Sequence, residues 1–300
     1  MSLVRMSGVT KRYGDVHALD GASFGLAENR IHGLLGRNGA GKTTAMQVLT
    51  GQVLETSGTV EVFGESPYEN ARVLNRVCFV KESQRYPDAF RVEHALRAAE
   101  LLHQNWDAAF AAELVADFGL PRRRRIKKLS RGMLSALGLI IGLASRAPLT
   151  FFDEPYLGLD AVARQMFYDR LLADYAEHPR TILLSTHLID EVSDLVEHVV
   201  LIDRGRILID EDADALRGAA VTVTGPAAAV EAFAAGHTEL HREQLAGFLR
   251  VTVAGAGEPP DGLGLEAEPV SLQQLVVRTT QHSNRTNGQP ATAGARGGEH

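Results

Sequence analysis

The chain has 300 residues, of which 45% are hydrophobic and 23% are charged, and these fractions are ordinary for globular proteins. They exclude a fibrous or wholly disordered protein, while the length favours two domains. Thirty-one basic against 37 acidic side chains give a net charge of −6, which argues against a chain built to coat nucleic acid or anionic lipid. The single cysteine, Cys78, excludes an intrachain disulfide and a cysteine-cluster metal site and fits a reducing cytoplasm.

Residues 1–10 lack the apolar run of a secretory signal and contain no twin arginine. The most apolar stretch, residues 133–144, is shorter than the roughly 18 residues that cross a bilayer. We therefore expect a protein that stays inside the cell and does not span the membrane by itself.

Short apolar runs alternate with helical patterns along the first two thirds of the chain. Six runs predict strands: 30–35, 77–80, 149–152, 181–184, 199–202 and 206–209. Because helices separate most of them, we expect a mostly parallel sheet covered by helices on both faces. The last two runs flank Asp203-Arg204-Gly205, a spacing that predicts a β-hairpin with glycine at the tight position.

Two other regions have their own patterns. Residues 91–128 change to a helical period that ends at Gly119-Leu120-Pro121, which predicts a separate helical subdomain. After Gly218, the pattern predicts strand, helix, strand and helix at 221–224, 226–235, 249–253 and 271–279, and hence a small second domain. The last segment, residues 283–300, contains no Val, Ile, Leu, Met or aromatic residue, so we expect a disordered tail.

Residues 36–43 read Gly-Arg-Asn-Gly-Ala-Gly-Lys-Thr and match the phosphate-loop pattern G-x-x-x-x-G-K-[ST] between a predicted strand and a predicted helix. Glycines let consecutive backbone N–H groups surround phosphate oxygens, and the helix adds its positive end. Lys42 supplies charge to the β- and γ-phosphates, and the Thr43 hydroxyl can ligate Mg²⁺. The residues expected to hold ATP here are Gly36, Arg37, Asn38, Gly39, Ala40, Gly41, Lys42, Thr43 and Thr44.

A second predicted strand ends in Asp153-Glu154, two carboxylates at the edge where α/β sheets bind ligands. We expect Asp153 to hold the Mg²⁺ shell and Glu154 to orient and deprotonate the water that attacks the γ-phosphate. The alternative is a solvated loop that happens to carry two acids.

The pentapeptide Leu129-Ser130-Arg131-Gly132-Met133 follows the helical insert, and here the chain resembles the nucleotide-binding subunits of ABC transporters. In that family the sequence is leucine, serine, glycine, glycine, glutamine, so this chain departs from it at Arg131 and Met133. The resemblance implies that Ser130 and Gly132 of one subunit close over the ATP held by another.

Other residues stand at positions where that family has functional residues. The resemblance implies that Tyr13 stacks on adenine, that Asp160 lies in the loop that crosses between subunits, and that His187 senses the γ-phosphate. Glu82 stands where the family has a glutamine that touches Mg²⁺, and Gln84 is the second choice for that position.

The resemblance implies an α/β P-loop NTPase fold, with an antiparallel β subdomain, at 1–218. Its helical subdomain covers about 84–145, a small α+β accessory domain covers 219–282, and the tail covers 283–300. The implied function is Mg²⁺-dependent ATP hydrolysis by a head-to-tail homo- or heterodimer that drives separate membrane-spanning subunits at the cytoplasmic face of the membrane. A weak similarity at 269–280 favours export.

Alternative functions are a soluble ATPase of the same superfamily acting on ribosomes or nucleic acid, and a nucleotide-binding regulator without turnover. One phosphate loop, no long heptad run and one cysteine disfavour the first, and the intact motif residues disfavour the second. The basic segment 121–128 is a solvated helix end, a contact with anionic lipid or a nucleic-acid contact, and we expect no nucleic-acid partner. His237 and His241 have helical spacing but no acid or cysteine cluster, so zinc is not expected there.

Overall fold

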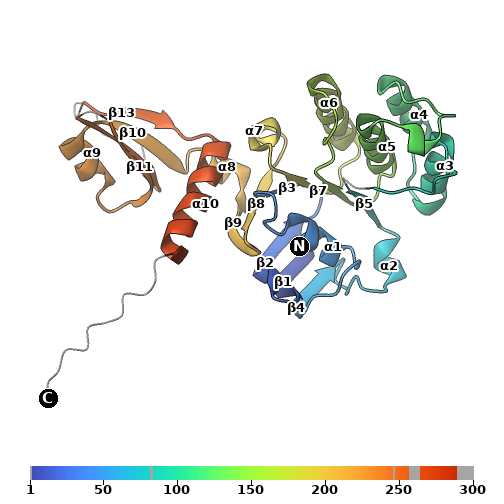
Figure 1. Ribbon diagram of the computed structural model, residues 1–300, viewed down its shortest axis with the longest axis horizontal. Coiled ribbons are helices and arrows are strands. Elements are labelled where there is room, and N and C mark those ends of the chain that lie inside the picture. Colours follow the sequence, from blue (N-terminus) through green and yellow to red (C-terminus); the bar gives the residue numbers. More distant parts are fainter. Residues whose placement is uncertain (1, 82–83, 246, 257–263, 289–300) are drawn as a thin grey trace, which may run out of the picture. The chain divides into compact units, whose positions relative to one another are not determined.

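The computed structural model describes residues 2–81, 84–245, 247–256 and 264–288, and it divides into two compact units, Met1–Ala213 and Asp214–His300 (Figure 1). Each unit has its own sheets and helices. None of the helices in these described ranges combines the length and apolar character needed to cross a bilayer.

The first unit contains a six-stranded sheet in the order β5-β6-β7-β3-β8-β9. Its strands are β3 (Ile31–Leu35), β5 (Val77–Lys81), β6 (Leu149–Asp153), β7 (Thr181–Thr186), β8 (His198–Asp203) and β9 (Arg206–Asp212). All neighbours are parallel except β8 and β9, which form the predicted hairpin through Arg204 and Gly205. Both turn residues have positive φ, 48° and 78°, as a tight two-residue hairpin requires. The prediction of a mostly parallel sheet is confirmed.

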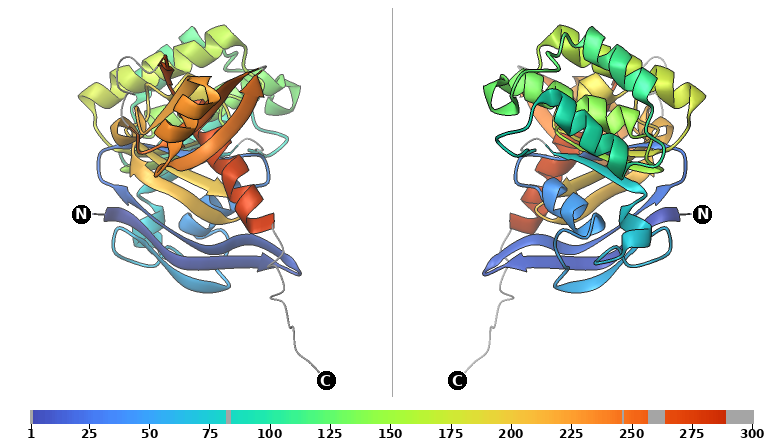
Figure 2. Two further views of the ribbon diagram at one scale, coloured as in Figure 1. Left: turned by 90° about the vertical axis from the view of Figure 1, so that its left-hand side faces the viewer. Right: turned by 90° about the vertical axis from the view of Figure 1, so that its right-hand side faces the viewer.

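Helices cover this sheet on both faces, as Figure 2 shows. They include α1 (Lys42–Leu49), α5 (Arg131–Ala144) and α6 (Ala161–Glu177), and every residue of β6 and β7 is buried. Gly142 lets α5 lie close to β6, because a Cβ there would sit 2.4 Å from the ring of Phe152. Burial on both faces explains why β6 is an unbroken apolar run.

A three-stranded antiparallel sheet, β2-β1-β4, lies below the central sheet in Figure 1. It comprises β1 (Ser2–Tyr13), β2 (Val16–Ala27) and β4 (Ser57–Val62). Val4, Met6 and Leu26 on one face are fully buried in the core shared with α1. This sheet is the antiparallel β subdomain of the predicted fold, although its strands were not located in the sequence.

The insert between β5 and β6 is helical, as predicted. It contains α3 (Val92–Leu102), α4 (Ala108–Asp117) and a 3₁₀ turn at Ile126–Lys128, followed by α5. A short helix, α2 (Ala71–Leu74), lies before β5 and outside this insert. The Asp107 side chain caps α4 by accepting a hydrogen bond from Phe110 N at 2.8 Å. Gly119, with φ of 57°, follows the end of this helix, where the sequence placed a terminator.

The second unit contains an antiparallel sheet in the order β11-β12-β10-β13. Its elements are α8 (Ala213–Leu216), β10 (Ala220–Pro226), α9 (Ala227–Ala234), β11 (Thr238–Leu245), β12 (Phe248–Ala254), β13 (Glu266–Pro269) and α10 (Leu272–Gly288). Val230 of α9 packs on Val223, Val251 and Val253 in its core.

Two expectations for this unit were wrong. His241 lies in strand β11 and His237 in the turn before it, so their spacing is not helical. Residues 283–288 were expected to belong to the disordered tail, but helix α10 continues through them. Buried Leu272 and Leu275 anchor the start of this helix, and a helix that has already formed is extended at a small free-energy cost for each added residue. Residues 289–300 lie outside the described ranges.

Candidate functional site

The predicted motifs meet at the carboxyl ends of the parallel strands. The phosphate loop follows β3, Asp153 ends β6, and His187 follows β7. Strands β6, β7 and β3 are adjacent, and the register pairs Asp153 with Ser185 and Leu35 with Thr186. Loops far apart in the sequence therefore converge at one edge, the usual ligand site of such sheets.

A cavity of about 540 Å³ lies at this edge. Its lining residues are Val16, His17, Ala18, Arg37, Asn38, Gly39, Ala40, Gly41, Lys42, Thr43, Thr44, Arg131, Glu154, Leu157 and His187. It thus gathers most of the phosphate loop with Glu154 and His187. Val16–Ala18, from the start of β2, and Leu157 were not anticipated from the sequence.

The phosphate loop curls around the ammonium group of Lys42. Nζ donates to the carbonyl oxygen of Gly36 at 2.7 Å and to that of Arg37 at 3.3 Å. Gly41 has φ of 114°, and a Cβ there would lie 2.6 Å from the carbonyl oxygen of Ala18, so only glycine fits. Apolar burial of α1 through Ala45, Met46, Val48 and Leu49 anchors the loop to the core.

Asp153 is buried between two hydroxyl groups. Thr43 Oγ1 donates to its Oδ2 at 2.7 Å, and Ser185 Oγ donates to its Oδ1 at 2.6 Å. The Thr43 and Asp153 oxygens form a pair suited to Mg²⁺, a hard cation that takes few protein ligands. In the described ranges no group of three or more His, Cys, Asp or Glu residues could hold a metal ion. Glu82, the third expected ligand, lies outside the described residues.

Glu154 has an unusual backbone and an incompletely paired carboxylate. Its φ is 47°, a left-handed conformation that costs a non-glycine residue about 1 to 2 kcal/mol. Oε1 lies 3.2 Å from Lys42 Nζ but has no hydrogen-bond partner among the described residues, whereas Oε2 lies 2.8 Å from His187 Nδ1. The side chain is buried, so this arrangement holds a charge away from water beside a single cation.

Two residues that the sequence did not single out hold Glu154 in place. Ser185 Oγ accepts a hydrogen bond from its backbone N at 3.0 Å, and the hydroxyl of buried Tyr156 donates to its Oε2 at 2.7 Å. The only sequence signal was position: Tyr156 follows the acidic pair by two residues, and Ser185 precedes His187 by two.

The segment that carried the family resemblance begins helix α5. Ser130 is exposed and caps the helix, because its Oγ accepts a hydrogen bond from Met133 N at 3.2 Å. Gly132 lies against the carbonyl of Gly158, where a Cβ would approach to 2.6 Å. Neither Ser130 nor Gly132 lines the cavity of its own chain, whereas Arg131 does.

Three other expected residues do not line the cavity. Asp160 caps α6 by accepting from Ala163 N at 2.8 Å. Tyr13 ends β1, is 47% exposed and has Lys11 Nζ 5.0 Å from its ring centre. Gln84 lies after β5 and donates its backbone N–H to Lys81 O at 3.3 Å.

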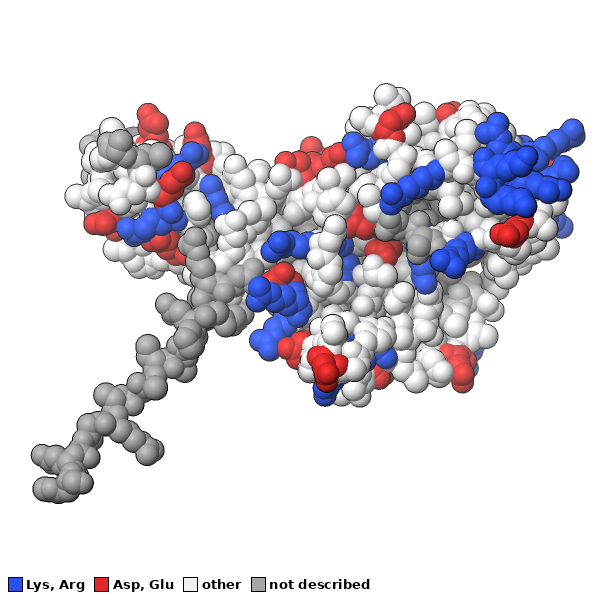
Figure 3. All heavy atoms as spheres, in the orientation of Figure 1, with Lys and Arg blue, Asp and Glu red and all other residues white. Residues whose placement is uncertain are grey.

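The basic segment lies in the helical insert. Its six basic residues, Arg122, Arg123, Arg124, Arg125, Lys127 and Lys128, are all exposed. Figure 3 shows Lys and Arg side chains gathered at the end of this unit that carries α3 and α4.

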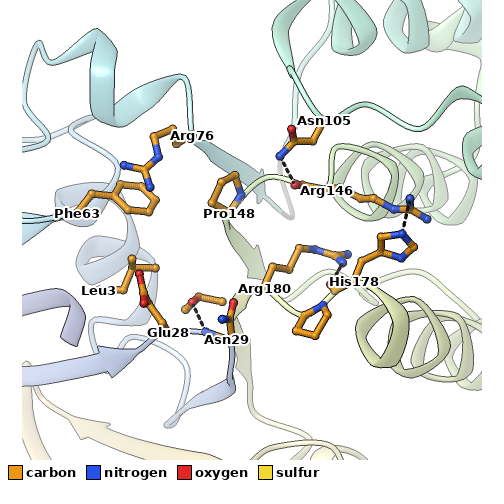
Figure 4. Close-up of a pocket in the computed structure, with 12 residues that line it drawn as sticks. Leu3, Glu28, Asn29, Phe63, Arg76, Asn105, Arg146, Pro148, His178 and Arg180 are labelled. Carbon is orange, nitrogen blue, oxygen red and sulfur yellow. Dashed lines mark hydrogen bonds between the residues drawn. The ribbon is translucent and has the colours of Figure 1, made fainter. Parts of the chain in front are cut away.

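A second cavity, of about 550 Å³, lies at the opposite edge of the same sheet (Figure 4). Pro148 and Thr181, at the starts of β6 and β7, line it with Arg146 and Arg180. Both arginines bind the buried carboxylate of Asp174: Arg146 Nη2 reaches Oδ1 at 2.9 Å and Arg180 Nη1 reaches Oδ2 at 2.7 Å. No expected site residue lies here.

Comparison with known proteins finds ATP-binding proteins of transporters among the relatives of this chain. The family model described as ABC transporter matches residues 19–157. The bacitracin transport ATP-binding protein of Bacillus licheniformis is 30% identical over 220 residues, which are 72% of this chain and 72% of that protein. The Nod factor export ATP-binding protein I of Burkholderia orbicola is 31% identical over 292 residues, which are 91% of this chain and 95% of the relative.

Solved structures share the fold. An ATP-binding subunit of an ABC transporter has a TM-score of 0.64 at 23% identity, over 72% of this chain and 92% of that chain. A bacterial ABC transporter cassette solved as a dimer has a TM-score of 0.62 at 18% identity, over 70% of this chain and 98% of that chain. With a phosphate loop, an acidic strand end and relatives that are at least 30% identical over more than two thirds of both chains, the chain belongs to the ATP-binding subunits of ABC transporters.

Proposed function

We propose that this chain hydrolyses ATP in the cavity at the carboxyl edge and thereby drives membrane-spanning partner subunits of an export-type transporter. The observation that carries the proposal is the pair formed by Lys42 Nζ and Glu154 Oε1, 3.2 Å apart in one cavity. Without nucleotide, each neutralises the other. A triphosphate attracts Lys42 and leaves Glu154 able to bind water.

The residues around the pair have complementary roles in this proposal. The backbone N–H groups of the phosphate loop and the start of α1 bind the phosphates. Thr43 and Asp153 would hold Mg²⁺, with Glu82 as a further ligand, and the ion would offset the negative charge of the phosphates. Glu154 orients the attacking water and takes its proton at Oε1.

His187 and Tyr13 complete the nucleotide contacts in this proposal. The imidazole of His187 lies on the cavity wall, where a hydrogen bond to the γ-phosphate would signal the triphosphate state. Exposed Tyr13, close to the β2 residues that line the cavity, offers a ring for the adenine.

A second ATP-binding subunit is part of the proposal. Ser130, Gly132 and Asp160 lie outside the cavity of their own chain, which supports a role for them over the nucleotide of a partner. A related cassette is described as dimeric. Whether the partner is a copy of this chain or a relative, the site needs both halves, because phosphoryl transfer depends on positioning and charge neutralisation.

Export is the proposed direction of transport. Named relatives act in bacitracin transport, daunorubicin resistance and Nod factor export. We place the subunit at the cytoplasmic face of the cell membrane beside its spanning partners, assign the accessory role to residues 219–282, and expect no nucleic-acid partner.

Replacing Glu154 by glutamine tests the proposal. Glu154→Gln keeps the size of the side chain but removes the base, so ATP turnover should fall by about 100-fold or more while ATP affinity changes by less than about threefold. Phosphate release and equilibrium nucleotide binding measure the two quantities. Glu211→Gln, at an exposed position of β9, is the matched control and should keep both. Turnover of Glu154→Gln at the parent rate would remove Glu154 from the role of base.

A further inference from the structure

The hydroxyl of Tyr156 lies at the centre of a buried hydrogen-bond chain. It donates to Glu154 Oε2 at 2.7 Å and contacts Thr186 Oγ1, which in turn accepts from the backbone N of Leu188 at 2.8 Å. Tyr156 is only 1% exposed. Its ring lies beside His187, with ring centres 6.3 Å apart. These hydrogen bonds therefore link the loop after β7 to the Glu154 carboxylate, which follows the end of β6.

Tyr156 can only act as a donor to Glu154. Burial, together with the negative charge of Glu154, raises the pKa of the Tyr156 hydroxyl far above its ordinary value. The neutral phenol is therefore the form that donates to Glu154 Oε2.

The hydrogen-bond chain through Tyr156 also determines which oxygen of the Glu154 carboxylate can bind water. Oε2 is held by Tyr156 and by His187 Nδ1, while Oε1 faces Lys42 and has no hydrogen-bond partner among the described residues. With both contacts in place the carboxylate cannot rotate about its terminal bond without breaking two hydrogen bonds. Oε1 is thereby the oxygen left for a water molecule.

We propose that Tyr156 is a positioning residue for hydrolysis, holding the Glu154 carboxylate turned so that Oε1 receives the proton of the attacking water. This inference rests on the proposed role of Glu154 as base. Tyr156 acts through Glu154, because it does not line the cavity itself. The groups that face the carboxylate are Lys42 from α1, His187 after β7 and Tyr156, with Asp153 adjacent in the chain.

The test is Tyr156→Phe, which removes one oxygen and keeps the buried ring. We expect kcat to fall about tenfold, with KM for ATP within about twofold, because ground-state binding does not use the hydroxyl. A merely structural role would lower thermal stability and leave the kcat of the folded protein unchanged.

Two variants serve as controls. Tyr175→Phe removes another phenol hydroxyl, which donates to Asn29 O at 2.7 Å and to Glu197 Oε2 at 2.9 Å, and should keep the parent kcat. Thr186→Val removes the hydroxyl behind Tyr156 and should lower kcat by a smaller factor than Tyr156→Phe.

Glu154→Gln separates this inference from the proposed function. If Glu154→Gln turns over at the parent rate, the proposed base is wrong and the inference fails with it. If Glu154→Gln is inactive while Tyr156→Phe keeps the parent kcat, the positioning role alone is overturned. A reduced kcat with an unchanged KM for ATP in Tyr156→Phe supports it.

Discussion

Two buried carboxylates lie at opposite edges of one sheet, and they are paired in different ways. Asp174, near the amino edge, has both oxygens bound by the guanidinium groups of Arg146 and Arg180. Glu154, at the carboxyl edge, has one oxygen near Lys42 without a hydrogen bond and a left-handed backbone. Figure 4 shows Arg146 and Arg180 on the wall of the cavity at the amino edge.

The comparison separates a carboxylate that holds the fold from one that does chemistry. A buried carboxylate whose two oxygens are both bound by arginines is occupied by structural contacts. Removing it leaves the charge of its partners without compensation. A buried charge with a strained backbone and one oxygen that has an ion-pair partner but no hydrogen bond is maintained at a cost to stability, which is typical of functional sites. The size of each cavity does not distinguish them, since both are about 540 to 550 Å³.

The largest expected loss of stability comes from a substitution at the amino edge of the sheet. Asp174→Asn leaves buried Arg180 without its carboxylate and Arg146 with that of Asp107 alone, and should lower the free energy of unfolding by about 3 to 5 kcal/mol. Urea unfolding followed by circular dichroism measures it. Asp169→Asn, on the exposed face of the same helix, should change the stability by less than about 0.5 kcal/mol. A small loss for Asp174→Asn would remove the distinction between the two edges.

A third buried ionisable group has no opposite charge hydrogen-bonded to it. His32 on β3 is fully buried, donates from Nε2 to Ala27 O at 3.0 Å, and has no partner at Nδ1 among the described residues. Burial lowers its pKa from 6.5 to about 4, with the nearby His198 adding to the effect. The unfolded chain therefore takes up the proton first as the pH falls.

The resulting pH dependence has a defined window. Full stability is present above pH 6.5, and up to about 3 kcal/mol should be lost as the pH falls toward 4. His32→Phe should flatten this part of the stability profile, while His17→Phe, at an exposed position, should leave it unchanged. Unfolding free energies measured at pH 7, 6, 5 and 4.5 in the three proteins give the slopes. Equal slopes in parent and His32→Phe would contradict the assignment.

The smallest effect concerns the helix cap at Ser130. Ser130→Ala removes the acceptor for Met133 N and should cost about 1 kcal/mol of stability. Ser130→Asp keeps an acceptor and hence the stability, but places a negative charge where the proposed partner's γ-phosphate would lie. Turnover should fall in both variants, and more in the aspartate. If the aspartate variant hydrolyses ATP at the parent rate, Ser130 does not face phosphate in the active assembly.

Much of the fold and site could be predicted because the signals are local. The phosphate loop and the Asp153-Glu154 pair are each contiguous, and the strands before them are short apolar runs. Strands β1 and β2 are harder to predict from the sequence. One face of each is exposed to solvent, so polar and apolar residues are mixed along the strand. Strand β13 is exposed throughout and has no apolar pattern at all.

The hydrogen-bond chain behind Glu154 could not be read from the sequence. Tyr156 and Thr186 are thirty positions apart and meet only because β6 and β7 are adjacent and in register. A tyrosine after a proline has many ordinary environments. Only the strand order shows that its hydroxyl ends beside a carboxylate.

The left-handed backbone at Glu154 also bears on laboratory evolution of this protein. Glycine or asparagine at that position would relax the main chain, since both tolerate a φ of 47° better than glutamate. A screen that rewards only heat resistance would therefore enrich such replacements and discard turnover in the same step. Selection for a hardier variant should be run with ATP consumption as a second criterion.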